Sequence, residues 1–202
     1  MNTSTLYTTV IVSLLTAGVF GFNFLTAAGY ETAEYKVIES DGRFEIREYP
    51  DLMLAATTTK LDAQGRDGSF MKLFGYISGA NESGEKIEMT TPVFMGQQEG
   101  KSGVEMGFVM PKEVANKGVP KPTGEQVEIK KRTGGRFAVI RFSGQLNSKT
   151  SQSAEAKLRA WMKTKGLEAD ESSIESAGYD PPFTPSFLRR NEILIRIAQT
   201  AK

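Results

Sequence analysis

The chain of 202 residues contains no cysteine and no histidine. Without cysteine, the protein can form no disulfide, no thiolate metal site and no cysteine nucleophile. Without histidine, it lacks the commonest general base and the commonest zinc ligand. A hydrolase of the Ser-His-Asp type therefore cannot be built from this chain.

The sequence also lacks an excess of charge of either sign, because 25 Lys and Arg residues face 24 Asp and Glu residues. No strong field attracts nucleic acid, so we expect no nucleic-acid partner. The charges are unevenly distributed, since none precedes Glu31. This break divides the chain into an N-terminal membrane anchor or signal segment, residues 1–30, and one domain, residues 31–202, which is large enough for its own core.

Residues 10–28 form a stretch of 19 uncharged, mostly apolar residues. As a helix this stretch would be about 28 Å long, close to the thickness of a bilayer core. The small residues 26–28 suit a signal peptidase, but no Lys or Arg precedes the stretch, and it is longer than the apolar part of a signal peptide. We therefore expect a single uncleaved membrane anchor, with export to a periplasmic or extracytoplasmic compartment as the alternative. The flanking charges do not fix its orientation.

The rest of the chain shows strand periodicity, interrupted twice by helical periodicity. Phe70, Leu73, Phe74 and Ile77 have the i, i+3, i+4, i+7 spacing of an amphipathic helix, and a second such helix is centred on Leu158. Segments 96–101 and 111–125, rich in Gly, Lys and Pro, are expected to be loops. The expected strands are residues 44–49, 52–59, 87–94, 104–109, 127–131, 137–142, 173–177 and 192–197.

The two halves of this pattern share one order and nearly one spacing. FEI at Phe44 corresponds to VEI at Val127, an offset of 83 residues, and the helices centred on Phe74 and Leu158 are offset by 84. This indicates a duplicated strand-strand-helix-strand-strand unit. The predicted fold class is α+β: a distorted antiparallel β-barrel with two helices, preceded by the N-terminal hydrophobic helix.

Several segments resemble the SOUL/haem-binding protein family. The two most distinctive are the C-terminal YDPPFTPSFLRRNEILIRI, residues 179–197, and KIEMTTPVFM, residues 86–95, which occur in the family's order. Similarity extends through YKVIESDGRFEIREYP, LFGYISGAN, MGFVMP and FAVIRFSG, so that it covers residues 35–197. The resemblance implies a duplicated α+β barrel that binds haem or a related tetrapyrrole and is not an enzyme.

In haem-binding relatives the ligand lies against an apolar face of the first helix. The matching residues here are Phe70, Met71, Leu73, Phe74 and Ile77. The same stripe is also what any helix uses to cover a core, so a purely structural role stays open.

The haem propionates would need cations, and a guanidinium can bind a carboxylate with two hydrogen bonds. Arg189 and Arg190, beside the proline-rich segment, could provide them, as could Lys72. The alternative is that one arginine pairs internally with Glu192 or Asp180 and the other is solvated.

Because the chain has no histidine, an axial ligand to haem iron would have to be Met or Tyr. Met71, Met89 and Tyr76 are the nearest candidates in the sequence. Methionines usually fill gaps in a core, so we expect apolar binding of haem as the cofactor, without strong ligation, and no metal site of the chain's own.

The expected function is reversible tetrapyrrole binding by a carrier or buffer, with the membrane as a second partner through residues 1–30. The alternative is a small-molecule hydrolase or effector-binding module on the same fold. Glu192, Glu88 and Tyr179 could supply a carboxylate and a phenol to an apolar pocket, where burial would raise the carboxylate pKa. A purely structural envelope protein is a third possibility.

Overall fold

The computed structural model describes residues 29–59, 68–97, 103–181 and 183–198. The predicted N-terminal hydrophobic helix lies outside these residues, and the anchor or signal function of residues 1–30 stays a prediction. Within the described ranges, no helix combines the length and apolar character required to cross a membrane.

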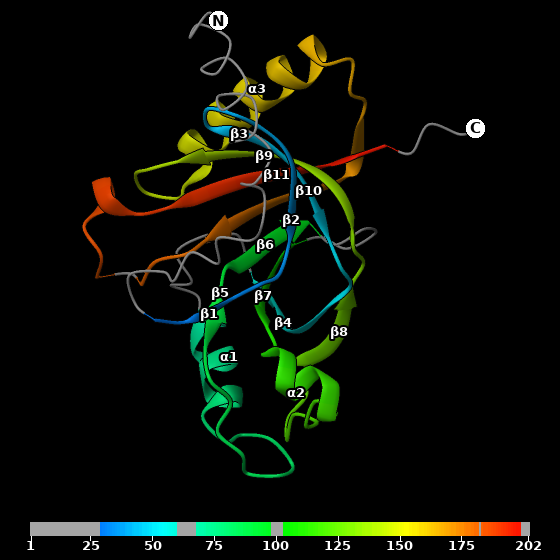
Figure 1. Cartoon of the computed structure of the whole chain (residues 1–202). Helices are drawn as coiled ribbons and strands as arrows, with labels where there is room; N and C mark the ends of the chain where they lie inside the picture. The colour runs from blue at the N-terminus through cyan, green and yellow to red at the C-terminus, as the bar shows by residue number, and fades with distance from the viewer. Residues whose placement is uncertain (1–28, 60–67, 98–102, 182, 199–202) are drawn as a thin grey trace, which may run out of the picture.

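One curled antiparallel sheet of nine strands dominates the molecule, with α3 at its upper end and α1 and α2 at its lower end (Figure 1). A separate parallel pair joins β1 to β5. The helices are α1 Ser69–Ile77, α2 Lys112–Lys117 and α3 Ser148–Thr164, with the 3-10 turn η2 Ser186–Leu188. The strands are β1 Glu31–Thr32, β2 Lys36–Asp41, β3 Phe44–Tyr49, β4 Leu52–Thr59, β5 Thr90–Thr91, β6 Val93–Gln97, β7 Val104–Val109, β8 Glu128–Arg132, β9 Gly135–Phe142, β10 Ala169–Gly178 and β11 Asn191–Ile197.

The strand order β2-β3-β9-β11-β10-β6-β7-β4-β8 shows the predicted duplication. One unit consists of β3, β4, α1, β6 and β7, and the other of β8, β9, α3, β10 and β11. The order is symmetric about the β6–β10 pair. The first strand of each unit crosses to the other, since β3 pairs with β9 and β8 pairs with β4.

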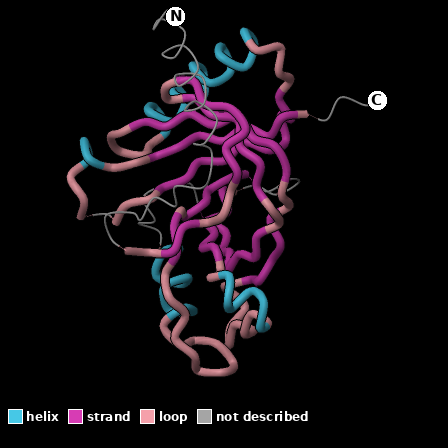
Figure 2. Tube along the Cα trace, in the orientation of Figure 1, coloured by secondary structure: helices cyan, strands magenta, loops and turns pink. Residues whose placement is uncertain are grey.

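The prediction of a distorted barrel with two helices is wrong, although the α+β class and the duplication are confirmed. The strands curl around without closing into a ring (Figure 2), and β2 and β8 are the edges of the sheet. A third helix, α2, forms inside the expected loop 111–125; it is only six residues long and buries none of them. The edge strand β2 escaped prediction because it is largely exposed and so shows no alternation of apolar and polar residues.

The helices cover equivalent strands, α1 on β4 and β7, and α3 on β9 and β11. Phe137 to Ile140 of β9 are all buried, although they are consecutive. Phe137 and Val139 face the inside of the curled sheet, whereas Ala138 and Ile140 face α3. A strand that is covered on both faces reads as an unbroken apolar run, as β9 does.

Candidate functional site

One side of α1 presents apolar side chains to solvent. This surface, the outer shoulder of α1, consists of Met71, Phe74 and the partly buried Phe70. Leu73 and Ile77 are buried against the sheet. Met71 is 62% exposed and Phe74 is 43% exposed, although both lie on the same helix. The predicted stripe is therefore split: Leu73 and Ile77 attach the helix to the core, and Phe70, Met71 and Phe74 remain within reach of a ligand.

Two aromatic rings lie close together on this shoulder. The rings of Phe70 and Phe74 are 6.3 Å apart between centroids and only 12° from parallel. Phe70 is fixed from behind by an edge contact with Phe108, 5.2 Å between centroids. Gly75 follows on the same helix, and a Cβ there would meet nothing within 4 Å.

The candidate axial ligands have different environments. The Tyr76 side chain is buried, and its hydroxyl donates a hydrogen bond to the Pro120 carbonyl at 2.7 Å. Burial raises the pKa of Tyr76 to about 12, which disfavours a tyrosinate ligand. Met89 is partly buried in the core beneath α1. Met71 is the candidate whose thioether is exposed on the shoulder.

The cations predicted to bind the haem propionates do not lie together. Lys72 belongs to α1 itself and has no ion pair with any described residue. Arg189 and Arg190 precede β11 and line a hollow against α3, whereas α1 packs on β4 and β7. The Arg189 guanidinium donates to the Thr184 carbonyl at 2.7 Å. The internal pairing considered for one arginine is present, because Arg190 pairs with Glu192 at 2.7 Å.

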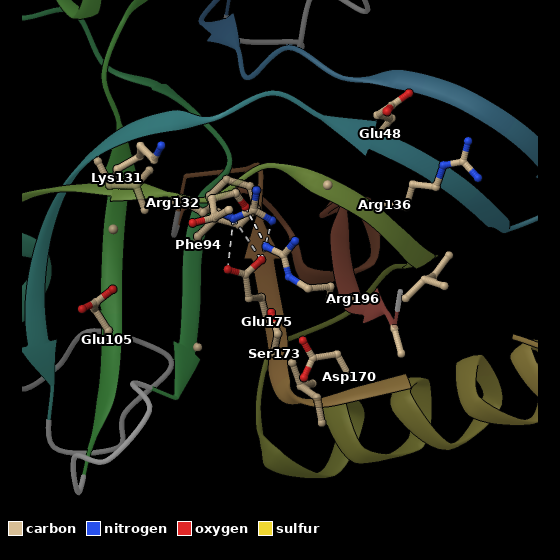
Figure 3. Close-up of a pocket in the computed structure, with 18 of the residues that line it drawn as sticks. Glu48, Phe94, Glu105, Lys131, Arg132, Arg136, Asp170, Ser173, Glu175 and Arg196 are labelled. Carbon is tan, nitrogen blue, oxygen red and sulfur yellow. Dashed lines mark hydrogen bonds and ion pairs between the residues drawn. The ribbon is translucent and has the colours of Figure 1, made fainter. Parts of the chain in front are cut away.

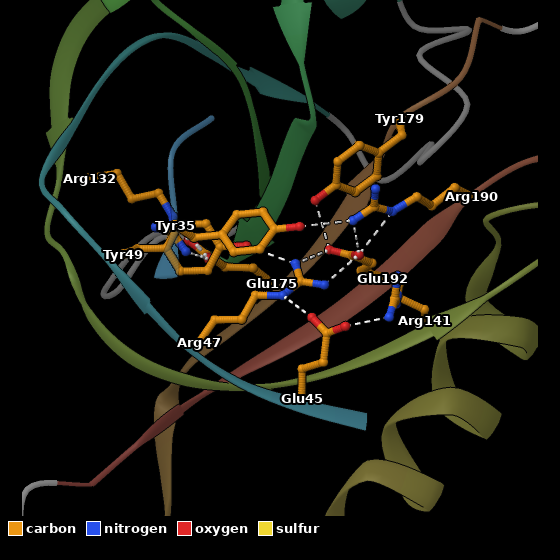
Figure 4. A network of polar contacts seen from close by, with 10 residues as sticks. All are labelled: Tyr35, Glu45, Arg47, Tyr49, Arg132, Arg141, Glu175, Tyr179, Arg190 and Glu192. Carbon is orange, nitrogen blue, oxygen red and sulfur yellow. Dashed lines mark hydrogen bonds and ion pairs between the residues drawn. The ribbon is translucent and has the colours of Figure 1, made fainter. Parts of the chain in front are cut away.

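Glu192 is the centre of a buried polar network (Figure 4). Arg47 binds both of its carboxylate oxygens, at 2.8 and 2.9 Å. Tyr179 donates its hydroxyl proton to the same carboxylate at 2.8 Å, and Arg190 binds it from the opposite side to Arg47. Arg47 also reaches Glu45 at 2.6 Å, and Glu45 in turn pairs with Arg141.

This network removes the catalytic role considered for Glu192 and Tyr179. Burial opposes ionisation of Glu192, but Arg47 and Arg190 outweigh it and hold the pKa of the carboxyl below its ordinary value of 4.5. The expectation of a raised pKa is therefore wrong in sign. Burial and the neighbouring Glu192 raise the pKa of Tyr179. Neither group is exposed to a substrate.

Arg47 is the direct partner of Glu192 that was not predicted from the sequence. It lies on β3, 145 positions from Glu192. The one available signal was its place in FEIREY. In a strand, Arg47 lies on the same face as Tyr49, two residues on, and a large aromatic side chain usually faces the core.

A hollow of about 1340 Å³ surrounds Arg132, Glu175 and Arg196 (Figure 3). At its base Arg132 forms hydrogen bonds to Glu175 at 2.5 to 3.0 Å. Arg132 Nη1 has no hydrogen-bond partner among the described residues, but the guanidinium lies over the rings of Phe94 and Phe137, at 4.4 and 4.6 Å.

Part of the charge that lines this hollow is paired. Lys130 pairs with Glu105 at 2.6 Å. Arg196 donates to backbone carbonyls of the β8–β9 turn at 2.7 Å. The buried Arg132 pairs with Glu175, and its nitrogen without a hydrogen bond is held among aromatic rings that attract cations. Glu48 and Arg136, which also line the hollow, have no ion pair among the described residues.

No group of three or more acidic residues within the described ranges could hold a metal ion, and the sequence contains no histidine or cysteine to complete one.

Comparison with known families gives one match that spans most of the chain. The model of the family described as SOUL heme-binding protein matches residues 30–196. Human heme-binding protein 2 is 28% identical over 176 residues, which cover 82% of this chain and 84% of the human protein. Heme-binding protein 1 of Xenopus laevis is 27% identical over 177 residues, covering 82% and 91%.

Similar folds occur among solved structures of low sequence identity. A hydrolase from Listeria innocua is 14% identical, has a TM-score of 0.56 and matches over 80% of this chain and 94% of its own. The C-terminal domain of EcmrR is 13% identical, also has a TM-score of 0.56 and matches over 78% and 98%. At these identities the likeness concerns the fold alone.

Proposed function

Because the chain belongs to the SOUL heme-binding protein family, we propose that it binds haem or a related tetrapyrrole on the outer shoulder of α1. The observation that supports this location is the pair of nearly parallel rings on α1, formed by Phe74, which is 43% exposed, and the partly buried Phe70. The flat face of a tetrapyrrole gains both apolar burial and ring stacking on such a surface.

Binding of this kind would be reversible, which suits a carrier or buffer. No histidine is available to ligate the iron, and Tyr76 is already engaged with Pro120. A thioether such as that of Met71 is the remaining type of ligand on the shoulder. Lys72 on α1, which has no ion pair among the described residues, would hold a propionate. Arg189 and Arg190 remain predicted contacts that would require a ligand extending to another part of the molecule.

A haemin titration followed by absorbance tests this proposal. Replacing Phe74→Asp puts a carboxylate where the ring would stack, and we expect haemin affinity to fall at least about tenfold. Because Phe74 is 43% exposed, the fold should survive, which circular dichroism can verify. Met71→Leu should leave the absorption spectrum of the complex unchanged if the thioether does not ligate iron.

Phe187→Asp is the matched control. It makes the same substitution at another exposed phenylalanine, 74% exposed on η2 rather than on α1. Equal losses in the two variants would mean that haemin adsorbs to apolar surface in general. A folded Phe74→Asp protein that binds haemin as tightly as the parent would contradict the proposed location.

A further inference from the structure

A second hollow, of about 680 Å³, lies between the first half of α3, strand β9 and the end of the β10–β11 connection. Its lining contains several cations and no carboxylate. The apolar residues Ile140, Phe142 and Leu188 complete its wall. The cations are Arg43, Arg141, Lys149, Lys157, Arg189 and Arg190.

Part of this positive charge is not compensated within the described residues. Arg141 pairs with Glu45, and Arg190 pairs with Glu192. Arg43, Lys149 and Lys157 form no ion pair with any residue that the structure describes. Like charges held together repel one another, so such a cluster is typical of a surface that meets an anion. The large hollow around Arg132 differs, because its cations are mostly paired.

A rigid turn next to the basic hollow holds large apolar side chains in water. Phe183 is 86% exposed, Phe187 74% and Leu188 63%. Leu188 also lines the hollow, so the apolar and basic surfaces are continuous. The turn projects from the outer end of the β10–β11 connection, at the left edge of Figures 1 and 2.

Hydrogen bonds fix this turn. The Leu188 amide donates to the Pro185 carbonyl at 2.9 Å, and the Gly144 amide donates to the Ser186 carbonyl at 2.9 Å. The second bond ties the turn to the segment that leads into α3. When the side chains of an ordered turn become buried, the backbone of the turn loses little conformational entropy. The free-energy cost of burying them is therefore low.

We propose that this turn and the basic hollow together dock the domain on a membrane that contains anionic lipids. The apolar side chains Phe183, Phe187 and Leu188 enter the interfacial layer, while the cations of the hollow contact lipid phosphates. A protruding apolar tip beside cations without carboxylates matches the layered chemistry of an anionic bilayer, in which acyl chains lie beneath phosphates. This surface is separate from the shoulder of α1, so the inference does not depend on haem binding.

The test places a fluorescent reporter on the turn of the full-length chain. The protein has no cysteine, so Thr184→Cys gives a single site for an environment-sensitive NBD label. Residues 10–28 could bind vesicles by themselves, which is why the reporter must be local. With phosphatidylcholine vesicles that contain about one-third phosphatidylglycerol, we expect emission to rise at least about twofold, to shift to the blue, and to weaken in high salt. Pure phosphatidylcholine vesicles should give little change.

Two double variants separate the parts of the surface. Lys149→Glu with Lys157→Glu should remove most of the response by reversing the charge, and Phe183→Ser with Phe187→Ser should remove it by deleting the apolar tip. All four side chains are exposed, so circular dichroism should show an intact fold. Haemin titration of the same variants should match the parent, because α1 is untouched.

Matched controls lie at the other end of the domain. Lys86→Glu with Lys121→Glu makes the same change of net charge and should keep the response, and a label on Glu82→Cys should report no bilayer. Equal responses to neutral and anionic vesicles, or an undiminished response in the first two variants, would overturn the proposal. So would a response to soluble glycerol 3-phosphate without vesicles, which would mark the hollow as a site for a free phosphate.

Discussion

At the scale of single residues, Glu192 shows how a buried charge can be structural. Moving a carboxylate out of water is costly, and the cost is offset only when partners satisfy it completely. Arg47 binds it through two hydrogen bonds, and Tyr179 and Arg190 supply the others. The carboxylate joins β11 to β3 and to the β10–β11 connection, so its role is to fix these segments together rather than to move protons.

Replacing Glu192→Gln should destabilise the protein by about 3 kcal/mol at pH 7, because the buried Arg47 and the partly buried Arg190 lose the carboxylate that they share. The folded-state pKa of Glu192 lies below 4.5, so its ionisation contributes stability above pH 4.5, and this contribution is lost as the pH falls through the folded-state pKa. The difference in the free energy of unfolding between parent and variant should therefore become smaller as the pH is lowered. Urea unfolding at pH 7 and at successively lower pH values measures it.

Glu48→Gln is the control for this measurement. Glu48 lies on the same strand as Arg47, but it is exposed and has no ion pair among the described residues. Its replacement should change the free energy of unfolding by less than about 0.5 kcal/mol. A Glu192→Gln protein as stable as the parent at pH 7 would show that the network contributes no net stability.

At the scale of elements, two equivalent turns meet where the repeat units interlock. The β3–β4 turn contains Asp51 and the β8–β9 turn contains Gly134, which are 83 positions apart, the offset of the duplication. The Gly134 amide donates to the Asp51 carboxylate at 2.8 Å. A Cβ on Gly134 would lie 2.8 Å from the Asp51 nitrogen and closer still to the Tyr49 carbonyl oxygen. The turns touch backbone to backbone, which only glycine permits.

Gly134→Ala should therefore cost at least about 2 kcal/mol of stability, because the backbone of one turn must move. Gly124→Ala, at a site where a Cβ would meet nothing within 4 Å, should be neutral within about 0.5 kcal/mol. Thermal or urea unfolding of both variants makes the comparison. Similar stabilities for the two would mean that the turns can separate without cost.

Elements with strong periodicity could be predicted from the sequence. β4 and β7 have their predicted bounds, residues 52–59 and 104–109, because their runs are long and bounded. The curvature of the sheet could not be predicted, since closure depends on whether its edge strands meet in space. The apolar stripe of residues 70–77 likewise predicted the helix α1. It did not predict which of its side chains are exposed, because periodicity does not show how much of a helix the sheet covers.

At the scale of the whole molecule, the site depends on contacts between distant parts of the chain. The duplication was visible as a constant offset, and the strand order confirms it. The pairing of Arg190 with Glu192 could be considered from the sequence, but that of Arg47 could not, because Arg47 reaches Glu192 across 145 positions and only the exchange of first strands brings β3 beside β9. Local pattern thus predicts the repeated unit, whereas the buried network follows from how two units interlock.

This interlocking predicts that neither half folds alone. Residues 29–124 would leave β3 without β9 and β4 without β8, and residues 125–202 would leave β9 without β3. Each fragment would expose the apolar face that the other covers, including the β6–β10 junction. We expect each fragment by itself to lack a cooperative unfolding transition.

Mixed or co-expressed, the two fragments should form a 1:1 complex with the circular dichroism spectrum of the intact domain. The cut at residue 124 falls in an exposed segment and removes no strand, and the Thr57 hydroxyl still reaches the Gln126 carbonyl across it at 2.6 Å. Gly134→Ala in the second fragment should weaken the complex, since the Asp51 and Gly134 turns then belong to different chains. A first fragment that unfolds cooperatively by itself would show instead that a repeat unit folds independently. The exchanged strands would then not be required for folding.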